Sequence, residues 1–173
     1  MEPWGRSSIT PQRLEGLVRR GLLCPLIVVE EWRLHGDEDE SSLPEGYVMS
    51  FAHFHERGFA IPAHKFLRGL LDYYQVELQH LTPNRIQHMV AFIALCEGFL
   101  GIDPHFDLWR HLFVVNLLKK WVEKQELHAP MGCAGIHLYN NRAEVYPLMR
   151  LSTSNKGWHL QWFYVKDDVA APC

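Results

Sequence analysis

Apolar residues recur at helical spacing in several separate stretches of this chain. The first stretch opens with Thr10 and Pro11, which are typical of a helix start: Thr caps free N–H groups, and Pro lacks a donor that would be unpaired there. It continues with an apolar series at i, i+3 and i+4, namely Leu14, Leu17 and Val18. Gly21 readily adopts a left-handed conformation, so the pattern predicts a helix that ends near this glycine.

Three further helices are predicted in the middle of the chain. One is expected to open at Pro62 and to bury an apolar stripe: Ala63, Phe66, Leu67, Leu70, Leu71 and Tyr74. A second starts at Thr82-Pro83 and carries more than one apolar stripe, so it is expected to be the most buried element as far as Leu100, with Gly101 as its end. Asp103 is expected to cap a third, whose inward residues are Leu108, Trp109, Leu112 and Phe113.

Strand-like segments lie on either side of this helical middle. Residues 47–52 read as a strand that leads into a helical turn ending at Gly58. Residues 136–138 and 145–146 flank Asn140-Asn141, which suggests a hairpin, and residues 158–165 read as a strand. The predicted fold is therefore α+β, with about four to five helices in the middle and a small antiparallel sheet. The sheet is expected to form mainly from the C-terminal segment, joined by the strand near Val48.

Length and composition indicate a globular chain. The sequence has 173 residues, of which 47% are hydrophobic and 21% charged, so global disorder is excluded and a single domain over 1–173 is expected. Residues 36–45 include the acidic run Asp37-Glu38-Asp39-Glu40 and are predicted to form a mobile loop. A calcium site there is disfavoured, because the ligands lack the spacing of a calcium loop.

Charge and cysteine usage bear on compartment and partners. The net charge of −3 excludes a strongly basic nucleic-acid binder, although a local basic face stays open. Four cysteines without a CxxC pair, no signal-peptide pattern and no long apolar run favour an intracellular protein, in the nucleus or the cytoplasm, that is neither secreted nor bound to a membrane.

The sequence has no clear match to a known catalytic motif. Residues 164–168 read Tyr-Val-Lys-Asp-Asp, close to the Tyr-x-Asp-Asp turn of reverse transcriptases, but Lys166 places an ammonium where two metal ions would bind. No GxSxG elbow, phosphate-binding loop or GxGxxG fingerprint occurs. We therefore predict no catalytic residue and no cofactor.

Eleven histidines raise the question of a zinc site. His53 and His55 lie two apart, yet the chain has no HExxH and no knuckle spacing. A zinc site formed by four ligands from distant segments stays open. The favoured interpretation is that the histidines are partly buried and pair with backbone groups or carboxylates. No metal site is predicted.

Basic residues beside tryptophans suggest a nucleic-acid surface. The candidate residues follow Trp109 and bracket Trp121: Arg110, Lys119, Lys120 and Lys124. Three arginines share the first helix: Arg13, Arg19 and Arg20. The alternative is a solvated face, since Glu123 and Glu126 interrupt the lysines, so nucleic-acid binding is expected to be weak at most.

Residues 96–110 read CEGFLGIDPHFDLWR, and the flanks add FAHFHERGF at 51–59, LTPN at 81–84, GW at 157–158 and WFYV at 162–165. In order and spacing, residues 20–168 closely resemble the gypsy-type transposon domain family of plants. The matching residues read as fold determinants: Gly58, Pro83, Glu97, Gly98, Gly101, Pro104, Trp109, Trp158 and Trp162.

The resemblance implies a retrotransposon-derived plant protein without established catalytic residues. We expect a non-enzymatic interaction or assembly module that binds a protein partner or itself. A nucleic-acid-binding or transposase- or integrase-like accessory protein is the alternative. The long C-terminal continuation usual in the family is missing. A fragment of a longer protein and a decayed copy of the element are both open as explanations.

Overall fold

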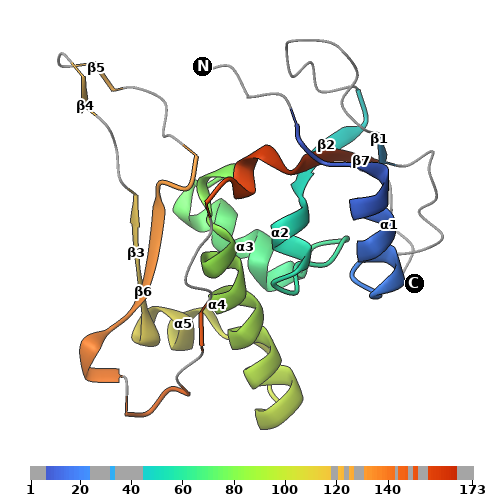
Figure 1. Ribbon diagram of the computed structural model, residues 1–173. Helices are drawn as coiled ribbons and strands as arrows, with labels where there is room; N and C mark the ends of the chain where they lie inside the picture. Colours follow the sequence, from blue (N-terminus) through green and yellow to red (C-terminus); the bar gives the residue numbers. More distant parts are fainter. Residues whose placement is uncertain are drawn as a thin grey trace. The chain divides into compact units, whose positions relative to one another are not determined.

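The structure is a computed structural model that describes residues 7–23, 32–33, 45–117, 121–122, 125–126, 131–142, 144–147, 150–151 and 156–166 (Figure 1). Contacts divide the chain into two compact units. Unit 1 comprises Met1–Pro62 and Lys156–Cys173, and unit 2 comprises Ala63–Asn155. Helices and small antiparallel sheets occur together in the described residues, so the predicted α+β class is confirmed. The single domain over 1–173 stays a prediction.

Unit 1 is built on a three-stranded antiparallel sheet in the order β1-β7-β2 (Figure 1). Its strands are β1 (Trp32–Arg33), β2 (Tyr47–Phe51) and β7 (Trp162–Lys166). β2 and β7 pair from Tyr47 opposite Lys166 to Phe51 opposite Trp162. The prediction that the C-terminal strand joins the strand near Val48 is thus confirmed.

Helix α1 (Pro11–Arg19) supplies much of the core of unit 1. The Thr10 hydroxyl accepts a hydrogen bond from the Arg13 backbone N–H at 3.3 Å, and Gly21 follows the helix with a φ of 69°, both as predicted. The core of this unit consists of Ile9, Leu14, Leu17, Ala52, Phe163 and Val165.

An aromatic cluster connects β2, helix α2 (Ala52–His55) and the segment before β7. The Phe51 and Phe54 rings lie 4.8 and 5.1 Å from the Trp158 ring. Trp158 belongs to a 3-10 turn, Trp158–Leu160, so the strand predicted over 158–165 begins only at Trp162. The turn lets Trp158 pack on the phenylalanines before the ladder starts.

Unit 2 contains helices α3 (Lys65–Tyr74), α4 (Pro83–Ala94) and α5 (Phe106–Leu112). Its strands are β3 (Phe113–Leu117), β4 (Trp121–Val122), β5 (Gln125–Glu126) and β6 (Ala134–Leu138). β3 pairs with β6, and β4 pairs with β5. Trp109 is fully buried at the centre, with ring centres 4.3 Å from Phe113 and 5.2 Å from Phe92.

Two predicted helix starts in unit 2 are wrong. α3 begins at Lys65 instead of Pro62, because His64 takes the cap position, where its Nδ1 accepts a hydrogen bond from the Phe66 N–H at 3.1 Å. α5 is preceded by His105 as its N-cap, so Asp103 does not cap it.

The hairpin predicted around Asn140-Asn141 is also wrong. Residues 136–138 pair with β3, whose Val115 lies opposite Ile136, and not with residues 145–146. Asn140–Arg142 forms a 3-10 turn. β3 contains β-branched residues and is a longer apolar partner for β6 than residues 145–146 are. The sequence analysis had not predicted a strand over residues 113–117.

The first prediction tests the placement of α4. Ile93 is 9% exposed, whereas its neighbour Ala94 is on the solvent side. Ile93→Asp should abolish the cooperative thermal melt, because a buried unpaired carboxylate costs several kcal/mol, a large part of a typical domain stability of roughly 5–15 kcal/mol. Ala94→Asp, the matched control, should melt close to the wild-type temperature. A near-native melt of Ile93→Asp would contradict this placement.

Candidate functional site

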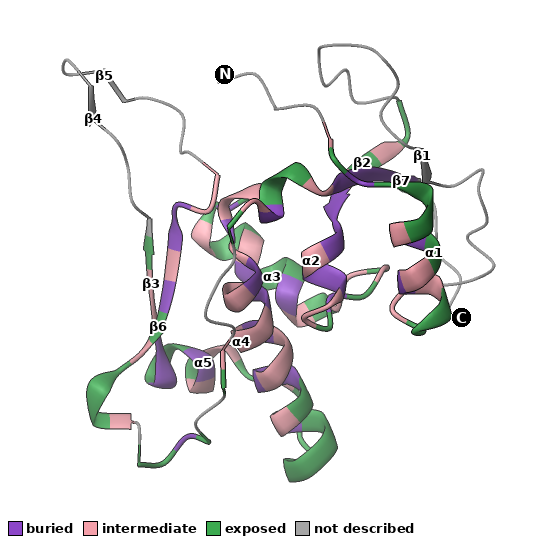
Figure 2. Ribbon diagram, in the orientation of Figure 1, coloured by how far each residue is buried: buried purple, intermediate pink, exposed green. Residues whose placement is uncertain are grey.

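The turn that follows α4 exposes a group of apolar side chains. Phe99, Leu100 and Ile102 are 84%, 56% and 45% exposed, and the ribbon beyond α4 is coloured as exposed in Figure 2. The prediction that the helix stays buried as far as Leu100 is therefore correct through Cys96 and wrong for the last turn. We call residues 97–103 the tip.

A change of helix type explains the exposure of the tip. Leu95–Leu100 forms a π-helical turn instead of continuing the α-helix. A π turn bonds i to i+5 and so holds one residue more than an α turn, which means that the i, i+3, i+4, i+7 spacing no longer marks one face. Gly101 then ends the helix with a φ of 64°, as predicted, and the N–H groups of Gly101 and Ile102 both donate to the Cys96 carbonyl.

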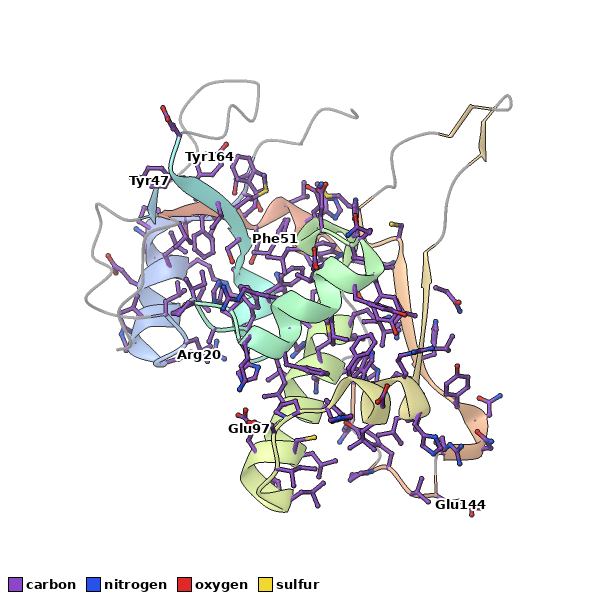
Figure 3. All side chains as sticks on the ribbon, turned by 180° about the vertical axis from the view of Figure 1, so that it is seen from behind. Arg20, Tyr47, Phe51, Glu97, Glu144 and Tyr164 are labelled. Carbon is purple, nitrogen blue, oxygen red and sulfur yellow. The ribbon has the colours of Figure 1, made fainter. Side chains whose placement is uncertain are left out.

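A hydrogen bond from His64 and an ion pair from Lys65 connect the tip to the start of α3. His64 Nε2 lies 3.0 Å from Glu97 Oε1, and Lys65 Nζ lies 3.6 Å from Asp103 Oδ1. Figure 3 shows Glu97 in the turn beyond α4. These side chains are solvent-exposed, so each pair contributes little to stability, but together they restrict where the tip can lie.

The other motif residues are spread over both units. Gly58 has a φ of 87°, Pro83 is a buried first residue of α4, and Gly98 lies on the exposed turn. Pro104 is half-buried between the tip and α5. Trp158 and Trp162 are 6% and 1% exposed in unit 1.

The predicted nucleic-acid residues are described only in part. Arg110 is exposed on α5, with its guanidinium carbon 6.0 Å from the centre of the Phe106 ring. The remaining three, Lys119, Lys120 and Lys124, lie outside the described residues, as do Asp167, Asp168 and positions 36–44 of the predicted mobile loop.

Two of the three arginines predicted to share the first helix pair with a carboxylate. Arg13 and Arg20 lie 2.8 and 3.0 Å from the same oxygen of Glu56, on the turn after α2. Figure 3 shows Arg20 at the end of α1. This arrangement attaches α1 to α2 and neutralises part of the basic face that the sequence suggested.

Unit 1 also buries a histidine beside a serine. His55 is fully buried, and its Nε2 lies 2.8 Å from the Ser50 hydroxyl, which is itself 1% exposed. Burial lowers the pKa of His55 to about 4, because the protonated ring would lose its hydration. A pair this inaccessible has the character of a core hydrogen bond and not of an activated nucleophile.

The described residues hold no group of three or more His, Cys, Asp or Glu side chains placed to bind a metal ion. Cys96 and Cys133 are buried free thiols whose pKa values are raised by burial. A cavity of about 10 Å³ beside Trp109, lined by apolar residues of unit 2, has room for about one water. It is far too small for a substrate. No helix in the described part of the chain has the length and apolar character needed to span a bilayer.

Comparison with known proteins gives one match. Residues 48–117 match the model of a family described as "Putative gypsy type transposon". The resemblance seen in the sequence is thus confirmed for this segment, which contains α3, α4, the tip and α5. No curated protein and no solved structure matches the chain. The plant origin and the wider span of 20–168 stay predictions.

Sequence reasoning placed Phe99 and Leu100 in the core and so missed the tip. A signal was present, because Gly98 and Gly101 bracket these residues and glycine weakens a helix interior. The helical spacing of Phe99 and Leu100 was given more weight than the two glycines, so the sequence analysis extended the buried helix over them.

The second prediction concerns pH and the buried histidine. The pKa of His55 is about 4 in the folded chain and near 6.5 when unfolded, so the unfolded state binds the proton first as the pH falls. Above about pH 6.5 His55 is neutral in both states, and the fold keeps its full stability. As the pH falls from about 7 to about 4, the free energy of unfolding should decrease by about 3 kcal/mol.

Denaturant unfolding of the wild type and of His55→Gln at both ends of this range measures the loss. Burial also lowers the pKa of His88 to about 4, but His88 is present in both proteins, so the difference between them isolates His55. Identical pH dependence in the two proteins would contradict the assignment.

Proposed function

We propose that this chain is a non-enzymatic interaction module of a transposon-derived protein, and that it associates with a second copy of itself through the tip. The observation that carries the proposal is the exposure of Phe99, Leu100 and Ile102 side by side in the sequence, within the matched segment. Contiguous exposed apolar side chains rimmed by polar ones are typical of protein interaction sites.

The charges around the tip favour a second copy as the partner. The rim carries both signs, with the carboxylates of Glu97 and Asp103 and the ammonium group of Lys65. A two-fold symmetric contact needs a patch that is complementary to itself, and an apolar centre with both charges at its rim meets that condition. Lys65 and Asp103 are 69% and 83% exposed, so either can exchange its partner for the one on the other copy.

The contact is expected to be weak. Three exposed side chains make a small patch, and interfaces that bury less than about 1,200 Å² belong to transient complexes. The association should therefore be reversible and visible as a dependence on concentration.

The third prediction is that Phe99→Ser abolishes the self-association. Sedimentation velocity of the full chain over a range of concentrations should show a rising average sedimentation coefficient for the wild type. The variant should stay monomeric, because it loses the most exposed apolar side chain of the tip.

Val145→Ser is the matched control, since Val145 is 70% exposed elsewhere in unit 2. It should associate like the wild type. A monomeric wild type, or equal behaviour of the two variants, would refute the tip as the contact.

The fourth prediction concerns the absence of catalysis. We propose that Asp167 and Asp168 hold no catalytic metal, because Lys166 stands beside them in the sequence. The double variant Asp167→Asn/Asp168→Asn should leave polymerase and strand-transfer assays with Mg²⁺ or Mn²⁺ at the wild-type background. A metal-dependent activity that disappears in the double variant would instead support the transposase-like alternative.

A further inference from the structure

Aromatic side chains from two helices of unit 2 meet at an exposed position. The Tyr73 ring, at the end of α3, lies 4.4 Å from the Phe106 ring at the start of α5, and 5.0 Å from that of Tyr74. Tyr73 is 56% exposed although it belongs to this cluster. Its ring is therefore held by its neighbours while much of its surface stays open to solvent.

Arg110 adds an unneutralised positive charge to the cluster. It follows Phe106 by one helical turn, so the two side chains share one face of α5, and its guanidinium lies over the Phe106 ring at 6.0 Å. Within the described residues no carboxylate lies at ion-pair distance from Arg110. This includes Asp72 and Asp107, which adjoin Tyr73 and Phe106 in the sequence.

Tyr74 is a third ring of the cluster. Its ring centre lies 6.2 Å from that of Phe106, and burial raises the pKa of Tyr74, a rise that the positive charge of Arg110 opposes. The cluster thus joins the end of α3 to the start of α5.

An exposed aromatic ring held by its neighbours, next to an arginine with no carboxylate partner among the described residues, matches the chemistry of unpaired nucleotides. Each base presents a flat face that stacks on an aromatic ring, and each phosphate attracts a guanidinium. In a duplex the base faces are covered by their neighbours, so a stacking surface distinguishes single strands from duplexes. A proline-rich peptide also docks on aromatic surfaces, but it offers no phosphate to Arg110.

We propose that Tyr73, Phe106 and Arg110 form a stacking platform for single-stranded nucleic acid. This inference goes beyond self-association and uses none of the residues of the tip. The net charge of −3 opposes a polyanion, so the affinity should be no tighter than micromolar and should fall steeply with salt.

Fluorescence anisotropy tests the platform with the full chain and a short labelled oligothymidylate at low salt. An abasic oligonucleotide with the same number of phosphates separates stacking from phosphate attraction. The oligothymidylate should bind at least about fivefold more tightly, since stacking of one base is worth about 1 kcal/mol or more. A duplex of equal length should bind more weakly than the single strand.

Substitutions assign the binding to the named residues. Tyr73→Ala should weaken oligothymidylate binding about fivefold or more, whereas Tyr73→Phe should retain it because the ring remains. Arg110→Ala should reduce the slope of log affinity against log salt by about one. Arg68→Ala, an exposed arginine on another face of α3, is the matched control and should leave the slope unchanged.

Several outcomes would overturn the platform. Equal affinity for the oligothymidylate and the abasic strand would exclude stacking. Unchanged binding by Tyr73→Ala would show that the strand binds elsewhere. Binding of a proline-rich peptide without binding of the oligonucleotide would assign the rings to another ligand. Phe99→Ser should bind oligothymidylate like the wild type, so failure of the self-association and failure of the platform are distinguishable.

Discussion

The pairing of β2 with β7 is the constraint on which the organisation of the chain depends. It joins residues 47–51 to residues 162–166, so one ladder closes a loop that contains all of unit 2. Such a closure costs chain entropy that grows only slowly with loop length, and the buried residues of β7 together with Phe51 and Trp158 offset it. Unit 2 is then free to bury a core of its own around Trp109.

That second core permits the exposed surfaces of unit 2. Phe92, Trp109 and Phe113 pack ring against ring, so α4, α5 and β3, which carry them, hold their positions without help from the tip. The tip and Tyr73 can thus remain exposed without loss of the fold. Because apolar and aromatic side chains in water contribute little to folding, their exposure on well-packed helices is better explained by binding than by stability.

The sequence predicted local structure better than it predicted partners. The caps at Thr10 and Gly101 and the start of α4 at Pro83 were found because each is decided by residues close in sequence. The pairing of β6 with β3 was missed, since nothing local distinguishes a near turn from a strand some twenty residues away. The site was harder still to predict. Arg110 was named, but Tyr73, which contacts the same Phe106 ring, belongs to another helix and was not singled out from the sequence.

The matched segment, residues 48–117, contains one strand of each of two pairs. β2 and β3 lie in it almost entirely, whereas their partners β7 and β6 lie outside it. An isolated piece with those limits would leave two strand edges unpaired, which favours aggregation over folding. The folded part of this chain therefore has to be larger than the matched segment. The residues of the tip and of the platform all lie inside the segment, but the strands that complete its two ladders lie outside it, so both surfaces depend on chain beyond the match.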